Sequence, residues 1–382
     1  MFSADQESWE RYSLMIRCEE GLVKKLVSES EQINLDGLDI EIKNIPDDDR
    51  EGVLDKREFF IRNAILAFQK MTPFKFSVEG MRLSTKTQCL DICKDEIINS
   101  SFEIDSDGRK ITCYRYERAD SAETVRPVLI YIHGGSFMAS SAKYYEQPCR
   151  FAAEQSGCVV LNIEYGLAPE NRYPAAIHDV LNLITYVYQN AADLRVDNSR
   201  IGLFGDSAGA NLALAAIIDN KSEAKVSYCG LFYPCVDLYS GDGLYDWNES
   251  DYSINEEERE LILSRLQLGR CDGKGNDSLM AGILLNYTGE RYEEVKRAPD
   301  VSPVYADLSV MPFTGFFSAE YDGLRIQTEY YARLLKKAGI PFKFTRYRGV
   351  THAFLDYFGI VPQGEASILQ MCGQVKDIWG LN

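Results

Sequence analysis

Short apolar runs alternate with amphipathic segments from residue 127 onward, and this alternation constrains the fold more than any other feature. The runs occupy residues 127–133, 158–165, 200–205, 228–234, 313–322 and 342–348. The segments with a helical pattern occupy residues 143–156, 174–190, 207–219, 325–338 and 363–379. Apolar strands separated by helices are typical of a parallel sheet that is covered on both faces. We therefore expect an α/β fold with a mainly parallel central sheet flanked by helices.

Two segments do not follow this alternation, and they suggest a helical cap. Residues 1–95 are polar with helical spacing, and we expect them to form an N-terminal cap segment. Residues 238–300 separate two strands by more than a structureless loop normally spans, so we expect a helical cap insertion there. The remaining residues form the two parts of the core, 96–237 and 301–382. The first part begins with a hairpin around the turn "DSDG".

Charge and composition exclude several classes of protein. The formal net charge of −17 repels phosphate backbones and anionic membrane surfaces, so neither nucleic acid nor a stable membrane contact is expected. No apolar run approaches the roughly 20 residues of a membrane span. The start of the chain mixes acids and bases, unlike a secretion signal, and the ten cysteines are then expected to be reduced thiols. These features predict a cytoplasmic protein.

The pentapeptide "GDSAG" places Ser207 between Gly205 and Gly209, where a strand is expected to become a helix. A nucleophile elbow needs this arrangement, because the sharp turn leaves no room for side chains beside the serine. A serine at this position is also a favoured helix N-cap. The pentapeptide alone therefore allows both interpretations.

A serine nucleophile needs a base, and the chain has only three histidines. His178 lies within a predicted helix, and His133 ends a predicted strand. His352 lies in the loop after the last predicted strand and alone follows Ser207, as the order serine, acid, histidine of α/β hydrolases requires. We therefore predict that His352 is the base.

The acid is expected at the end of the preceding strand, in "FTGFFSAEYD". Asp322 and Glu320 lie two residues apart, so both would face the same side if the strand continued. We favour Asp322 because it lies at the loop. It would accept a hydrogen bond from His352 and fix the tautomer of the ring.

The motif "HGGSF" ends an earlier strand and is expected to bind the oxyanion. Consecutive glycines can point backbone N–H groups at a substrate, so we predict an oxyanion hole made of Gly134, Gly135 and Ala208. His133 would hold this loop in place. The neighbouring residues Ser136, Phe137 and Asp206 are predicted to contact the substrate, and Asp206 is also expected to support the elbow from behind.

Together these motifs resemble the hormone-sensitive lipase family of α/β-hydrolase carboxylesterases. The matching stretches are "HGGSF", "YGLAPENRYPAAIHDV", "GDSAGANLA", "AEYDGLR" and "HAF". The resemblance implies an α/β-hydrolase fold with a cap, two-step ester hydrolysis by the triad Ser207, Asp322 and His352, and no metal or other cofactor. This chain departs from the family pattern at Ser136, Gly166 and Ala210, which stand where the family usually has Gly, Arg and Gly.

The expected function is hydrolysis of short- to medium-chain acyl esters, with a small-molecule ester as substrate. The same triad also suits an amidase or an acyltransferase. A binding protein without catalysis is disfavoured because His352 is present. The strand at residues 342–348 is expected at a sheet edge, where it would pair into a homodimer or carry charges that prevent such pairing.

Overall fold

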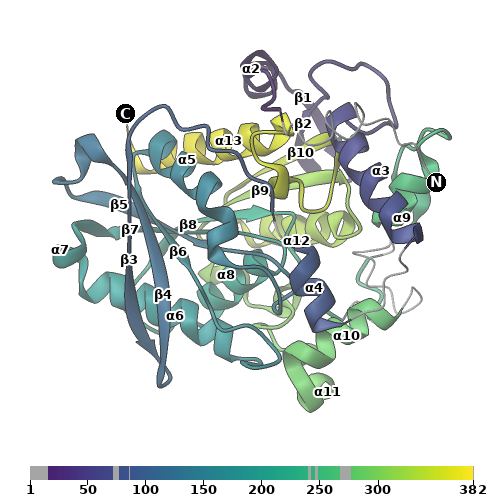
Figure 1. Ribbon diagram of the computed structural model, residues 1–382. Helices are drawn as coiled ribbons and strands as arrows, with labels where there is room; N and C mark the ends of the chain where they lie inside the picture. Colours follow the sequence, from purple (N-terminus) through teal and green to yellow (C-terminus); the bar gives the residue numbers. More distant parts are fainter. Residues whose placement is uncertain are drawn as a thin grey trace.

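The computed structural model describes residues 16–71, 77–85, 87–239, 242–245, 248–266 and 277–381. Within these residues, ten strands form one sheet in the order β1-β2-β10-β9-β8-β7-β5-β6-β4-β3 (Figure 1). The strands are β1 (Glu31–Leu35), β2 (Leu38–Lys43), β3 (Ile97–Ser106), β4 (Arg109–Arg118), β5 (Arg126–Ile132), β6 (Val159–Ile163), β7 (Val196–Asp206), β8 (Val226–Phe232), β9 (Phe313–Tyr321) and β10 (Phe342–Thr351).

The middle of the sheet is parallel. Strands β6, β5, β7, β8, β9 and β10 pair in parallel with one another in this order, whereas β4 pairs antiparallel with both β6 and β3. These parallel strands coincide with the apolar runs of the sequence, and β3 and β4 form the expected hairpin. The predicted fold class, a mainly parallel sheet flanked by helices, is confirmed.

Helices cover both faces of the sheet. Along β5, Leu129 and Tyr131 belong to one buried cluster, and Val128 and Ile130 belong to the other, because successive side chains of a strand point to opposite faces. The first cluster includes residues of α2 (Glu20–Ser28), α5 (Glu146–Ser156) and α13 (Pro362–Trp379). The second includes residues of α6 (Ala175–Gln189), α8 (Ala208–Asp219) and α12 (Arg325–Ala338).

The N-terminal segment joins the sheet and so differs from the wholly helical cap expected for residues 1–95. Strands β1 and β2 form a hairpin, and β2 pairs in parallel with β10, with Glu41 opposite Thr345. The prediction that residues 342–348 form a sheet edge is therefore wrong, and pairing of this strand into a homodimer is blocked by β2. The outer strand is β1, which is short and presents Glu31, Gln32 and Asn34, as protected edges do.

Several helices gather beyond one end of the sheet, at the right and lower right of Figure 1. They are α3 (Lys56–Met71), α4 (Val78–Ser84), α9 (Arg259–Leu266), α10 (Asp277–Thr288) and α11 (Tyr292–Val295). A further short helix, α7 (Ala191–Leu194), precedes β7. The described part of the predicted insertion 238–300 thus contains helices joined by turns and irregular segments. Residues 240–241, 246–247 and 267–276 lie outside the described residues, as do residues 1–15, 72–76 and 86 of the N-terminal segment. In the described part of the chain, no helix has the length and apolar character that crossing a membrane requires.

Candidate active site

Ser207 lies in the sharp turn between β7 and α8. Its backbone angles, φ 52° and ψ −116°, belong neither to a strand nor to a helix, and such strained residues cluster at functional sites. A Cβ atom on Gly209 would lie 2.0 Å from the carbonyl oxygen of Ile132, and one on Gly205 would lie 2.7 Å from the same atom. The end of β5 therefore forces both positions to be glycine. The Ser207 side chain makes no capping hydrogen bond to α8, so the N-cap interpretation is not supported.

His352 and Asp322 continue from Ser207 in a chain of hydrogen bonds. The Oγ of Ser207 is 2.9 Å from Nε2 of His352, and Nδ1 of His352 is 2.8 Å from Oδ2 of Asp322. Asp322 is fully buried, and its Oδ1 accepts a hydrogen bond of 2.8 Å from the N–H of Leu324. An ionised Asp322 places the ring proton on Nδ1, which leaves Nε2 free to accept the Ser207 proton. The structure thus brings together the three residues that the sequence predicts.

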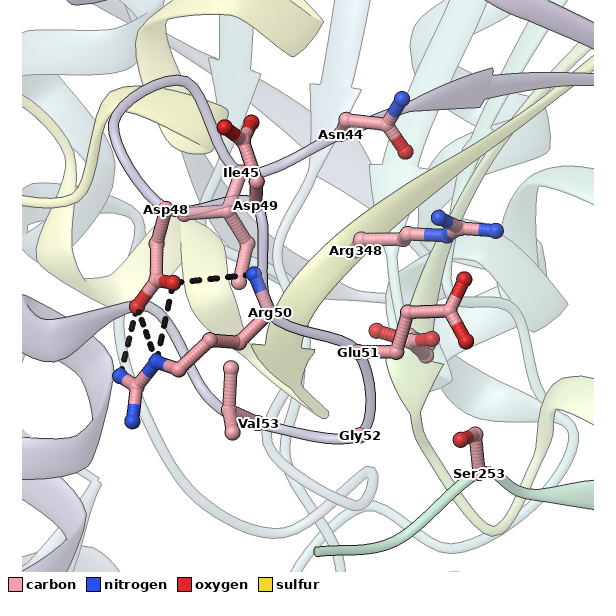
Figure 2. A pocket seen from close by; sticks show the side chains of 11 residues that line it. Asn44, Ile45, Asp48, Asp49, Arg50, Glu51, Gly52, Val53, Ser253 and Arg348 are labelled. Atoms are coloured by element: carbon pink, nitrogen blue, oxygen red, sulfur yellow. Dashed lines mark hydrogen bonds and ion pairs between the residues drawn. The ribbon is translucent and has the colours of Figure 1, made fainter.

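Glu320, the competing acid, points elsewhere. Its Oε2 accepts a hydrogen bond of 2.8 Å from the N–H of Gly349, and burial raises the pKa of this carboxyl group. Glu320 lines a cavity of about 160 Å³ beside the loop 44–53. Figure 2 shows this cavity, with Arg50 paired to Asp48 on that loop and Arg348 across from it. None of Ser207, Asp322 and His352 lines the cavity, so it is separate from the candidate active site.

The other two histidines lie away from this chain of hydrogen bonds. His178 is exposed and lies 2.7 Å from a carboxylate oxygen of Asp107. His133 is fully buried, and its Nδ1 donates to the carbonyl oxygen of Gly134 at 2.7 Å. Burial lowers the pKa of His133 to about 4, so its ring is neutral near pH 7. These contacts agree with the expected role of His133 in holding the loop.

Asp206 and Gly134 bond to each other and face away from the substrate side. Oδ1 of Asp206 accepts hydrogen bonds from the N–H of Gly134 at 2.7 Å and from the hydroxyl of Tyr131 at 2.6 Å. The Gly134 N–H is therefore already used, and its prediction as an oxyanion donor is wrong. Asp206 is 1 % exposed, so its predicted contact with substrate is also wrong, while its expected support of the elbow agrees with these bonds. Burial, together with the charge of Asp356, raises the pKa of Asp206 to about 7.

The backbone turns sharply after Gly134, so the following N–H groups point in new directions. Gly135, Ser136 and Phe137 have φ angles of 116°, 55° and 64°. In the described part of the chain, the N–H groups of Gly135, Ser136 and Ala208 have no hydrogen-bond partner. Ala208 is the first residue of α8, and its N–H belongs to the unpaired donors of a helix N-terminus. Gly135 and Ala208 are two of the predicted oxyanion donors. The residue type gives no indication of the N–H of Ser136, because the direction of a backbone N–H group depends on the backbone angles.

Helix α10 contacts this loop through an aromatic pair. Phe137 is 2 % exposed, and its ring stacks on that of Tyr287 in α10, with centroids 3.9 Å apart. The backbone carbonyl of Tyr287 also accepts a hydrogen bond of 2.9 Å from the N–H of Tyr173. Helix α10 is thereby tied to the core beside Ser136 and Phe137. The Phe137 side chain is as buried as that of Asp206, so its predicted contact with substrate is also wrong, whereas the contact of Ser136 with substrate remains a prediction.

Residues 129–356 match the family described as "alpha/beta hydrolase fold", which is more than half of the chain. The chain belongs to this family. The fold and the family that the sequence motifs implied are thereby confirmed.

Known esterases are among the similar proteins. An arylesterase of Saccharolobus solfataricus is 29% identical over 260 residues, which are 66% of this chain and 75% of that protein. The structure is similar to that of a hyperthermophilic esterase from the archaeon Pyrobaculum calidifontis, with a TM-score of 0.68 at 27% identity, covering 86% and 100% of the two chains. It is also similar to EstE1, a thermophilic carboxylesterase from a metagenomic library, with a TM-score of 0.64 at 25% identity, covering 79% and 98%.

Proposed function

We propose that this protein is a serine carboxylesterase that hydrolyses small acyl esters through an acyl-enzyme. The observation that carries the proposal is the continuous chain of hydrogen bonds from Ser207 through His352 to Asp322. The esterases among its relatives support the same class of reaction.

In the first step, Ser207 attacks the ester carbonyl carbon. His352 takes the hydroxyl proton on Nε2 while Asp322 stabilises the resulting imidazolium. The carbonyl oxygen becomes an oxyanion, and the alcohol leaves with the proton held by His352. Ser207 is left carrying the acyl group.

In the second step, water repeats the same chemistry on the acyl-enzyme. His352 removes a proton from water, the tetrahedral intermediate forms again, and the acid leaves as Ser207 recovers its proton. The cycle consumes one ester and one water, and side chains of this chain carry every proton transfer.

The oxyanion is bound by the backbone N–H groups of Gly135, Ser136 and Ala208. The unpaired state of these three donors supports this assignment, which replaces Gly134 by Ser136. One donor of this kind typically contributes about 2.7–4 kcal/mol of transition-state stabilisation. Because the donors are backbone groups, the serine that replaces the usual third glycine still supplies one.

The substrate is an ester with a short to medium acyl chain. The stacked rings of Phe137 and Tyr287 place bulky groups beside the proposed oxyanion hole, which supports a limited acyl pocket. A series of p-nitrophenyl esters from acetate upward measures this preference, and we expect kcat/KM to fall for long chains.

The decisive experiment compares the wild type with Ser207→Ala on p-nitrophenyl butyrate. We expect kcat to fall by about 10⁶-fold, the effect of removing a triad nucleophile. A fluorophosphonate should also add to Ser207 in the wild type, as seen by mass spectrometry of the peptide. His178→Gln, which changes an exposed histidine outside the site, serves as the control and should retain wild-type kcat. Undiminished hydrolysis by Ser207→Ala would overturn the proposal.

A further inference from the structure

An ion pair on the N-terminal helix α3 lies buried beside the loop that carries His352. Glu58 and Arg62 are one helical turn apart, with side chains that are 0% and 4% exposed. Nε of Arg62 donates to Oε1 of Glu58 at 2.8 Å. Residues of these types on a helix usually face solvent, so their burial needs a reason.

Both members of the pair bind the backbone around His352. Nη2 of Arg62 donates to the carbonyl oxygens of His352 at 3.0 Å and Ala353 at 3.4 Å. Oε1 of Glu58 accepts from the N–H of Thr351 at 3.2 Å and from the hydroxyl of Thr351. The pair therefore holds residues 351–353 through both donors and acceptors.

The backbone at this point needs external support. Ala353 has a positive φ of 65°, so the chain turns sharply immediately after His352. The His352 ring is also held by its bonds to Asp322 and Ser207 and by an edge contact with the Tyr233 ring, and the bond to Ser207 breaks in each catalytic step. A fixed backbone keeps Nε2 in place while that bond is absent.

Arg62 is itself well fixed in a charged state. Burial alone would lower its pKa, but the charge and hydrogen bond of Glu58, together with Tyr357 and Asp356, outweigh this effect, and the pKa stays above its ordinary value. The guanidinium also lies 4.9 Å from the centre of the Tyr357 ring, within the range of a cation–π contact.

We propose that Glu58 and Arg62 are positioning residues that hold His352 in the geometry of a general base. The N-terminal segment then has a part in catalysis. This inference rests on the proposed esterase function, because it concerns the same base.

The test measures kcat and KM for p-nitrophenyl butyrate, and the rate of fluorophosphonate labelling of Ser207, in Arg62→Gln. We expect kcat and the labelling rate to fall together by about 10- to 100-fold, as for a base displaced by a fraction of an ångström, with KM changed less than about threefold. Arg57→Gln is the matched control, because Arg57 lies on the same helix and pairs with Asp47 and Asp55. It should retain wild-type kcat. Equal losses in both variants would show a general effect of α3 packing and would overturn the inference.

Arg62→Gln leaves the buried Glu58 charge unpaired, so a second variant guards against loss of folding. The double variant Glu58→Gln/Arg62→Met removes both charges together and removes the guanidinium that donates to the carbonyls of residues 352 and 353. We expect it to show the same fall in kcat, and Arg62→Lys, which keeps one charged donor, to recover part of it. Wild-type kcat in the folded double variant would overturn the inference. Absence of turnover and of Ser207 labelling in the wild type would instead reject the proposed function.

Discussion

The two sides of the candidate active site are built in different ways. On the nucleophile side, the supporting bonds join the end of β5 to the elbow, two neighbouring stretches at residues 131–137 and 205–209. On the base side, Arg62 contacts His352 across 290 positions of the chain. The nucleophile side is formed by turns at the ends of two adjacent strands. The base side depends instead on helix α3, which comes early in the chain and contacts the loop after β10. A short motif can therefore specify the nucleophile, but it cannot specify what holds the base.

On the base side, Asp322→Asn is expected to lower kcat more than the other substitutions that test this comparison. Asparagine keeps the shape of the side chain but favours the wrong tautomer of His352, so kcat should fall by about 10⁴-fold with little change in KM. Steady-state kinetics on p-nitrophenyl butyrate measure this loss. A fall no greater than that of Asp206→Asn would mean that the acid is wrongly assigned.

Gly209→Ala tests how closely Gly209 packs against the end of β5 on the nucleophile side. The added Cβ would lie 2.0 Å from the backbone oxygen of Ile132 and 2.5 Å from that of His133, and backbone atoms cannot move aside cheaply. Overpacking of this kind typically costs about 1–3 kcal/mol, so the free energy of unfolding should fall by at least that amount. Urea denaturation measures the change. Gly373→Ala is the control, because a Cβ there meets nothing within 4 Å, and equal effects at the two positions would contradict the crowded elbow.

Asp206→Asn should have the smallest effect on activity. The asparagine oxygen can still accept hydrogen bonds from Tyr131 and Gly134, so we expect a loss of kcat within about tenfold, the value of one hydrogen bond.

The same variant has a distinct pH signature. The pKa of Asp206 is raised from 3.8 to about 7, so between these values the folded state holds a proton that the unfolded state has lost. Its contribution to stability is complete below pH 3.8 and declines as pH rises through 7. The stability of Asp206→Asn relative to wild type should therefore improve between pH 5 and pH 8, as measured by Tm at both values. A constant difference in Tm would contradict the raised pKa.

The core of the fold was predictable because its strands and helices have distinct apolar patterns. Buried parallel strands are apolar throughout, as in 127–133 and 200–205, and these became β5 and β7. The positions of Ser207, Asp322 and His352 followed from the order of motifs along these elements. Gly134 was misassigned because an N–H direction depends on backbone angles, and here a buried Asp206 takes that donor.

The N-terminal hairpin had a signal that the helical interpretation missed. Asp36 and Gly37 both have positive φ angles, and the dipeptide Asp-Gly between alternating apolar residues is a strong indicator of a hairpin. Nothing in the sequence marks Glu58 and Arg62, in contrast, because helical spacing of charged residues normally indicates a solvated face. Their burial becomes evident only when α3 is placed against the loop after β10.

The pairing of β2 with β10 also sets an order of events during synthesis. Glu41 and Thr345 are 304 positions apart, so β2 emerges from the ribosome long before its partner strand exists. Contacts between residues so far apart in the sequence form late. Pairing of distant segments is slow, and domains fold largely as they are synthesised. The pairing of the hairpin with β10, and the contact of α3 with the loop after β10, must therefore wait for the last strand of the sheet. The arrangement around His352 therefore depends on β10, a strand that is synthesised long after β2 and α3.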